Sequence, residues 1–230
     1  MSLMLASVSS LEEAALALDA EVDIIDLKQP AAGALGALDV QTVKRICRYC
    51  EGRRPVSATV GDLPMQPGLI ADAVAAMAAT GVDYIKIGFF PGGDWLGIVQ
   101  KLSVLARHNQ ALIAVLFADT AHDPAMIEVL KAAGFKGVML DTMDKSKGAL
   151  TDVMAPEKIE AFVNQAKSRQ MLCGLAGSLR LKDIPRLIAY QPDYLGFRGA
   201  LCVRHERTAQ LDKQAMINIK QAITNGNDTQ

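Results

Sequence analysis

The sequence has few of the features that mark several broad classes of protein. It contains only 4 Cys, 3 His and 5% aromatic residues among 230 residues, and its formal net charge is −1. No long run of one charge sign is present, which argues against a nucleic-acid or anionic-membrane partner. No apolar stretch reaches the roughly 20 residues that a membrane-spanning helix requires. The N-terminus, "MSLMLASVSSLEE", lacks the basic start and long apolar segment of a signal peptide, so we expect a cytoplasmic protein.

The few potential metal ligands do not form a metal-binding pattern. Cys47 and Cys50, in "CRYC", have a metal-like spacing. They fall in a helical pattern, however, and no second Cys or His pair follows at zinc-finger distance. The three histidines share no spacing. We therefore expect reduced, structural thiols and no metal site.

Short apolar runs alternate with helical patterns along the whole chain. The runs span residues 3–8, 22–29, 55–61, 83–90, 111–119, 137–142, 171–177 and 194–200. Each is typical of a buried parallel strand. Helical patterns separate them, for example at 10–20, where Ser10 and Glu13 form a capping-box pattern, and at 67–81 and 156–170.

Eight strands alternating with helices predict a single-domain (β/α)₈ TIM barrel over residues 1–223. The alternative is an open doubly wound sheet, which usually has a glycine-rich fingerprint after its first strand. Here that strand is followed by "SVSSLEEA", which contains no glycine. The barrel is therefore the favoured fold. We expect residues 224–230, "TNGNDTQ", to form a disordered C-terminal tail.

Charged side chains stand near the ends of several predicted strands, where the active sites of such barrels lie. Side chains alternate along a strand, so Asp26 and Lys28 share one face. The residues next to them in the strand are large and apolar, which suits the outer face of the barrel beneath the helices. We therefore expect Asp26 and Lys28 to point into the barrel. The same reasoning turns Lys86, Ser57 and Thr59 inward. Strand 137–142 contributes Asp141, with Lys145 four residues later.

Two interpretations of this charged set remain open from the residues alone. Asp26–Lys28 and Asp141–Lys86 can be structural ion pairs that tie the barrel together. A buried pair is, however, often no more stable than an apolar replacement, so a cluster of them suggests another role. That role is amine chemistry, since a lysine near other cations in a dry pocket becomes a nucleophile toward carbonyls. The spacing does not tell which lysine attacks.

The loops after the last two strands carry the pattern of a phosphate site. In these barrels the loops after strands 7 and 8 commonly bind phosphate. "GLAGSLR" places Gly177 and Ser178 at a strand-to-helix turn, and "GFRGALC" places Arg198 beside Gly199. We predict that these four residues bind a substrate phosphate. The inward-facing Ser57 and Thr59 are further candidates for substrate contact.

Six segments, in this order, resemble those of a known enzyme family. They are "DIIDLKQPAAGALGA", "VSATVGDLPMQPG", "DYIKIGFF", "MLDTMDKSKG", "LCGLAGSL" and "LGFRGALC". Together they resemble the (5-formylfuran-3-yl)methyl phosphate synthases, also called 4-(hydroxymethyl)-2-furancarboxaldehyde-phosphate synthases. The similarity extends from Met4 to about residue 220. One departure is a shorter segment between 111 and 139, where a lysine of some members has no counterpart.

The resemblance implies a fold, a reaction and a set of active-site residues. The family adopts a (β/α)₈ barrel and condenses two molecules of glyceraldehyde 3-phosphate into a phosphorylated furan aldehyde, with loss of phosphate and water. The product feeds methanofuran or methylofuran, furan cofactors that carry formyl groups in one-carbon metabolism. The family's imine-forming lysine matches Lys28. Its companion residues match Asp26, Lys86, Asp141 and Lys145. Neither a metal nor an organic cofactor is expected.

Other functions remain possible at this stage. One is a class I Schiff-base aldolase acting on another phosphorylated sugar, and a second is a non-catalytic metabolite-binding barrel. The expected partner in each is a small phosphorylated molecule. A homo-oligomer is also open, because Phe89, Phe90 and Trp95 can pack against a second subunit, line the site or cover the barrel rim.

Overall fold

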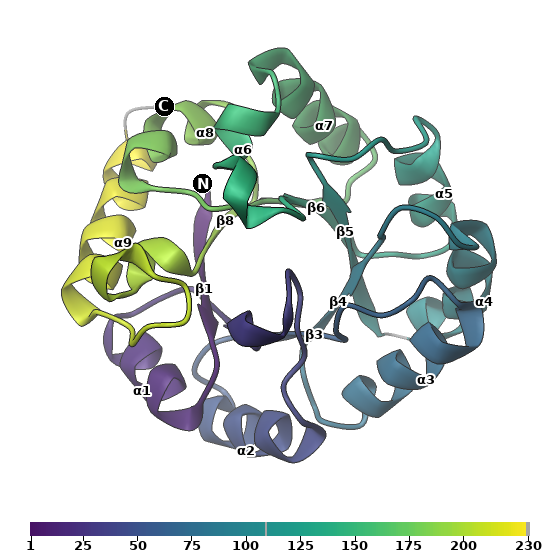
Figure 1. Cartoon of the computed structure of the whole chain (residues 1–230), viewed down its shortest axis with the longest axis horizontal. Helices are drawn as coiled ribbons and strands as arrows, with labels where there is room; N and C mark the ends of the chain where they lie inside the picture. The colour runs from purple at the N-terminus through teal and green to yellow at the C-terminus, as the bar shows by residue number, and fades with distance from the viewer. Residues whose placement is uncertain (109, 229–230) are drawn as a thin grey trace.

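The chain forms a closed barrel of eight parallel strands surrounded by helices, as the computed structural model in Figure 1 shows. The structure describes residues 1–108 and 110–228. The strands pair in sequence order, and β8 returns to pair with β1. They are β1 Leu3–Val8, β2 Ile24–Leu27, β3 Val56–Thr59, β4 Tyr84–Gly88, β5 Ala111–Phe117, β6 Gly137–Asp141, β7 Leu172–Leu175 and β8 Tyr194–Phe197. The predicted fold is therefore confirmed.

The helices follow the strands and cover the outside of the barrel (Figure 1). They are α1 Leu11–Asp19, α2 Val40–Cys50, α3 Pro67–Ala78, α4 Trp95–Arg107, α5 Met126–Ala132, α6 Leu150–Val153, α7 Pro156–Ser168, α8 Ile184–Ala189 and α9 Lys213–Asp228. Short 3₁₀ turns lie in the loops, at η1 Pro30–Ala32, η2 Lys145–Lys147, η3 Leu181–Asp183, η4 Gly199–Leu201 and η5 Val203–His205. No helix in residues 1–108 or 110–228 is long and apolar enough to span a bilayer.

Two apolar clusters hold the barrel together. The larger lies between the outer faces of the strands and the helices, and includes Ile25, Leu27, Ile85 and Ile87. These are the residues that flank the charged positions of β2 and β4, so the alternation argument is correct for both strands. The smaller cluster fills the interior and consists of Leu5, Ile24, Ala34, Leu35, Ile113, Val115, Phe117, Met139, Ala176 and Tyr194.

The loop after β2 fills part of the barrel mouth. Figure 1 shows this segment, drawn in indigo, folded over the centre of the barrel. Asp62 holds it there, because its carboxylate accepts hydrogen bonds from the backbone N–H of Ala34 at 2.7 Å and of Leu35 at 2.6 Å. Leu35 is 1% exposed and belongs to the same interior cluster as Phe117. Gly88 leaves room for it, since a Cβ there would lie 2.7 Å from Leu35 Cδ1.

The C-terminal helix reaches further than the sequence suggests. We expected a disordered tail from residue 224, but α9 continues to Asp228, and residues 229–230 lie outside the described residues. The side chain of Asn227 accepts a hydrogen bond from Ser2 N at 2.8 Å and donates one to Ser2 O at 3.0 Å. These contacts to the chain's opposite end explain the difference, because no local pattern encodes them.

The aromatic residues after β4 pack within this chain. Phe89 is 2% exposed and meets the ring of Phe135 edge-on, and the ring of Phe90 lies 4.7 Å from that of Phe117. The partly buried Trp95 packs against the outer cluster. The packing of these three side chains gives no support for a homo-oligomer, which stays a prediction.

Candidate active site

A buried carboxylate–lysine pair lies inside the barrel at the level of β2 and β4. The Nζ atom of Lys86 is 2.7 Å from Oδ1 of Asp26, which is 0% exposed. The hydroxyls of Ser57 and Ser7 donate hydrogen bonds to the same carboxylate, at 2.6 and 2.8 Å. Burial alone would raise the pKa of Asp26, but the Lys86 and Lys28 ammonium groups, with the hydrogen bonds from Lys86 and Ser57, outweigh it and lower the pKa.

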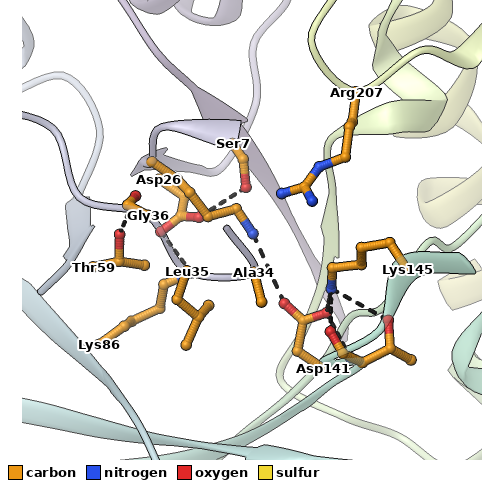
Figure 2. Close-up of polar contacts among 12 residues, drawn as sticks. Ser7, Asp26, Ala34, Leu35, Gly36, Thr59, Lys86, Asp141, Lys145 and Arg207 are labelled. Atoms are coloured by element: carbon orange, nitrogen blue, oxygen red, sulfur yellow. Dashed lines mark hydrogen bonds and ion pairs between the residues drawn. The ribbon is translucent and has the colours of Figure 1, made fainter. Parts of the chain in front are cut away.

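A second carboxylate, Asp141 at the end of β6, faces two other lysines. Lys145 Nζ is 2.5 Å from its Oδ1, and Lys28 Nζ is 3.8 Å from its Oδ2. The backbone N–H of Thr142 also donates to Asp141, at 2.7 Å. Burial alone would raise the pKa of Asp141, but the Lys145 and Lys28 ammonium groups outweigh it and lower the pKa to about 2. Figure 2 shows Asp26 near Ser7 and Lys86, and Asp141 beside Lys145.

The ion pairs differ from those that the sequence suggests. We considered Asp26–Lys28 and Asp141–Lys86, whereas the structure pairs Asp26 with Lys86 and Asp141 with Lys28 and Lys145. In these barrels, inward side chains from alternate strands lie in one layer. Asp26 and Lys86, on β2 and β4, therefore meet. Lys28 lies one layer higher and reaches Asp141 across the mouth.

Lys28 has the surroundings of a reactive amine. It directly follows β2, and its backbone N–H still bonds Val8 O at 3.0 Å, which keeps its side chain in the inward register. The residue is 6% exposed, and Nζ makes no hydrogen bond within the described part of the chain. Burial, together with the Lys86 and Lys145 charges, outweighs the attraction of Asp141 and lowers the pKa of Lys28 to about 8. About a tenth of such amines are neutral at pH 7.

A strongly basic cavity of about 170 Å³ surrounds this amine. It opens on the side of β1, β6, β7 and β8, beside the part of the mouth that Leu35 fills. Its basic side chains are Lys28, Lys86, Lys145, Arg180, Arg198 and Arg207, and its one acidic lining residue is Asp141. Such a surface favours an anionic ligand. The clustering of the five predicted catalytic residues, Asp26, Lys28, Lys86, Asp141 and Lys145, is thus observed; their roles stay predictions.

The predicted phosphate loops reach the cavity, but Arg198 has a different place from the one expected. Gly177, Ser178, Arg198 and Gly199 all line the cavity. Gly177 and Ser178 have φ values of 105° and 49°, so the turn after β7 uses the left-handed region twice.

All five N–H donors of Arg198 are already used. Nη1 and Nη2 bind the Glu13 carboxylate at 2.6 and 3.1 Å. The remaining donors bond the backbone oxygens of Ser7, Arg207 and Ala209. Arg198 therefore does not fit its predicted role as a phosphate chelator. It ties the loop after β8 to β1 and α1. Glu13 departs here from the capping-box pattern, in which its carboxylate would accept from the backbone N–H of Ser10. The carboxylate instead accepts from the backbone N–H of Ser9, at 2.6 Å, and also binds Arg198.

Ser57 and Thr59 do not fit substrate contact either. Neither residue lines the cavity, and they are 2% and 0% exposed. The Ser57 hydroxyl is bonded to Asp26, and that of Thr59 donates to Gly36 O at 3.0 Å. Both side chains point inward, as the alternation predicts. They are nevertheless covered by the loop after β2, and the sequence pattern does not encode the position of that loop.

The sequence reasoning missed three titratable residues of the cavity lining, namely Arg180, His205 and Arg207. Arg207 Nη2 donates to Gly33 O at 2.9 Å, which joins the loops after β8 and β2 across the mouth. In Figure 2 its guanidinium points toward the lysine and aspartate cluster. The one sequence feature that could have indicated them is that basic residues follow the glycine-containing turns after β7 and β8. Among the described residues, no group of three or more His, Cys, Asp or Glu side chains could hold a metal ion.

Comparison with known sequences identifies the family. The 4-HFC-P synthase profile matches residues 4–220. The chain belongs to the 4-HFC-P synthase family. The family that the motifs suggested is confirmed, and this membership makes the chain an enzyme of the synthase type.

Named relatives of this chain match almost its whole length. A Methylorubrum extorquens protein provisionally named (5-formylfuran-3-yl)methyl phosphate synthase is 43% identical over 97% of this chain and 92% of its own. The (5-formylfuran-3-yl)methyl phosphate synthase of Methanocaldococcus jannaschii is 33% identical over 95% of this chain and 98% of its own.

Among solved structures, 3-hexulose-6-phosphate synthase from Salmonella typhimurium superposes with a TM-score of 0.71 at 17% identity, covering 97% of this chain and 99% of its own. Phosphoribosyl anthranilate isomerase from Thermus thermophilus gives a TM-score of 0.69 at 11% identity, covering 98% and 99%. At these identities the two structures share the barrel fold alone with this chain.

Proposed function

We propose that this protein condenses two molecules of glyceraldehyde 3-phosphate into (5-formylfuran-3-yl)methyl phosphate through an imine on Lys28. The observation that carries the proposal is the Lys28 amine. It lines a basic cavity, has a pKa lowered to about 8, and is not held by a hydrogen bond within the described residues. Lys86 suits nucleophilic attack less, because Asp26 binds its ammonium group at 2.7 Å. The product would supply a formyl-carrying furan cofactor, methanofuran or methylofuran.

The reaction starts with attack of the neutral Lys28 amine on the aldehyde carbon of one triose phosphate. Water leaves, and the resulting iminium ion acidifies the adjacent C–H bond. Asp141, at 3.8 Å from Lys28 Nζ, is the nearest carboxylate to receive that proton, and Lys86 with Asp26 can relay it. The enamine that remains is a carbon nucleophile for the second triose phosphate.

Ring closure then gives an aromatic furan. Over the whole reaction two triose phosphates lose one phosphate and two waters, which balances the furan product. Lys145 and Arg207 line the same cavity and neutralise the charge that develops on the departing phosphate. Loss of one such donor in other enzymes costs about 3 kcal/mol of transition-state stabilisation.

A single-substrate assay tests the proposal. We expect the protein, given glyceraldehyde 3-phosphate alone, to form a product with near-ultraviolet absorbance and to release one phosphate per two trioses. A class I aldolase would form an aldol product without that absorbance. A non-catalytic barrel would gain thermal stability with the triose phosphate but turn none over. Either of these outcomes rejects the condensation.

The pH dependence of imine formation follows from the Lys28 pKa. The reactive form is the neutral amine, so the rate of borohydride-trapped adduct formation should rise with pH and level off above about pH 8. The Lys145 charge lowers the Lys28 pKa and Lys145 also competes for Asp141. Lys145→Met should therefore raise the Lys28 pKa and move this rise to higher pH. An unchanged or more acidic profile in Lys145→Met would contradict the electrostatic argument.

A further inference from the structure

Arg180, the second residue after Ser178, has a fixed backbone at the edge of the cavity. Its N–H donates to Asp183 Oδ2 at 2.8 Å, and its C=O accepts from Asp183 N at 3.0 Å. Asp183 is itself buried, and its other oxygen accepts from Thr151 Oγ1 at 3.0 Å. Contacts between the segments after β6 and β7 therefore fix the position of the Arg180 backbone.

The far end of the side chain carries an unusual group. Arg180 Nη1 is buried and has no hydrogen-bond partner among the described residues, and no other buried side-chain nitrogen or oxygen there shares this state. Buried polar groups in folded proteins are nearly always paired, so each exception needs an explanation. The residue lines the cavity, and its Nη1 lies 3.5 Å from the position that a Cβ on Gly199 would occupy. The guanidinium thus lies against the glycine turn after β8.

The Arg180 side chain also differs from the other lysine and arginine side chains of the cavity, each of which has an ion-pair or hydrogen-bond partner among the described residues. Lys86 pairs with Asp26, Lys28 and Lys145 share Asp141, and Arg198 binds Glu13. No carboxylate lies within ion-pair distance of Arg180 in the described part of the chain. Arg207 has no carboxylate partner either, but its Nη2 donates to Gly33 O at 2.9 Å. A cation with a buried, unused donor and no carboxylate partner is suited to an anion that enters with the substrate.

We propose that Arg180 binds the phosphate group of the triose whose aldehyde reacts with Lys28, and makes the site selective for phosphorylated aldehydes. This inference rests on the proposed function for the identity of the aldehyde. The turn at Gly177 and Ser178 lines the same cavity as Arg180. The expectation that Arg198 performs this task is thereby replaced, since its donors are engaged with Glu13 and three backbone oxygens.

The test compares a phosphorylated with an unphosphorylated aldehyde. In Arg180→Met we expect the concentration of glyceraldehyde 3-phosphate needed for half-maximal borohydride trapping on Lys28 to rise about 10- to 100-fold. The inhibition constant of inorganic phosphate against this trapping should rise by a similar factor. Trapping of D-glyceraldehyde, which has no phosphate, should change less than about twofold. Arg180→Lys, which keeps the charge, should recover part of the loss.

The controls separate binding from folding and from the imine chemistry. Lys182→Met removes an exposed cation two residues away and should behave as wild type. Equal losses with both aldehydes in Arg180→Met, or no change with either, would overturn the proposal. If Arg180→Met unfolds, Arg180→Gln takes its place. If wild type traps neither aldehyde, the imine assignment fails separately. Arg180 is then judged by whether inorganic phosphate raises the melting temperature of wild type but not of the variant.

Discussion

Lys28→Ala is expected to lower kcat by at least about 1,000-fold and to abolish the borohydride-trapped adduct with glyceraldehyde 3-phosphate. Lys28 lines the cavity, makes no hydrogen bond through Nζ among the described residues, and has a pKa lowered to about 8, so part of this amine is neutral near pH 7. Removing the nucleophile leaves the cationic cavity intact, so substrate binding should weaken far less than turnover. Mass spectrometry of the trapped protein and initial rates measure the two effects.

Two further substitutions at this position sharpen the interpretation. Lys28→Arg keeps a cation near Asp141 but cannot form the imine, so it should be as inactive as Lys28→Ala. Lys28→Met should keep or raise the melting temperature, because burial disfavours the Lys28 charge and Asp141 retains Lys145 as its partner. An adduct on Lys86 or Lys145 in wild type would reassign the nucleophile, and substantial activity in Lys28→Arg would exclude the imine.

Asp26→Ala is expected to destabilise the barrel by about 3–5 kcal/mol, a large part of the total stability of a typical domain. Asp26 is 0% exposed and is the acceptor for Lys86, Ser7 and Ser57. Its removal leaves an unpaired buried ammonium group and two buried hydroxyls without their acceptor. Urea unfolding monitored by circular dichroism measures the loss.

A double substitution and an exposed control test the cause of that loss. Asp26→Leu combined with Lys86→Met removes both charges and should recover much of the stability. Asp39→Ala, at the exposed start of α2, removes a carboxylate without uncovering a buried cation and should have a much smaller effect. A double variant as unstable as Asp26→Ala would show that the ion pair is not the cause.

The same pair predicts a pH dependence of stability. The pKa of Asp26 is lower in the folded protein than its ordinary value of 3.8, so its contribution is present above that pH and is lost as the pH falls through the folded pKa. The difference in unfolding free energy between wild type and Asp26→Ala should therefore shrink below about pH 3.8. A difference that stays constant to pH 2 would argue against a charge effect.

The sequence was sufficient for the features that depend on local periodicity. Eight buried runs between helical patterns were enough to predict the barrel, because each strand and helix carries its own pattern of apolar spacing. The alternation along β2 and β4 correctly turned Asp26, Lys28 and Lys86 inward, since successive side chains of a strand point to opposite faces. The inward direction of these three side chains therefore follows from the strand pattern alone.

Tertiary structure alone decided which of these groups pair and which remain available. Asp26 meets Lys86 because β2 and β4 contribute to one interior layer, and Arg198 is bound by Glu13, 185 residues away along the chain. The unpaired Nη1 of Arg180 and the position of Leu35 in the barrel mouth likewise depend on loops that meet in space. Periodicity specifies the direction of a side chain relative to its own strand. It carries no information on contacts between distant segments, which come from barrel closure and loop packing.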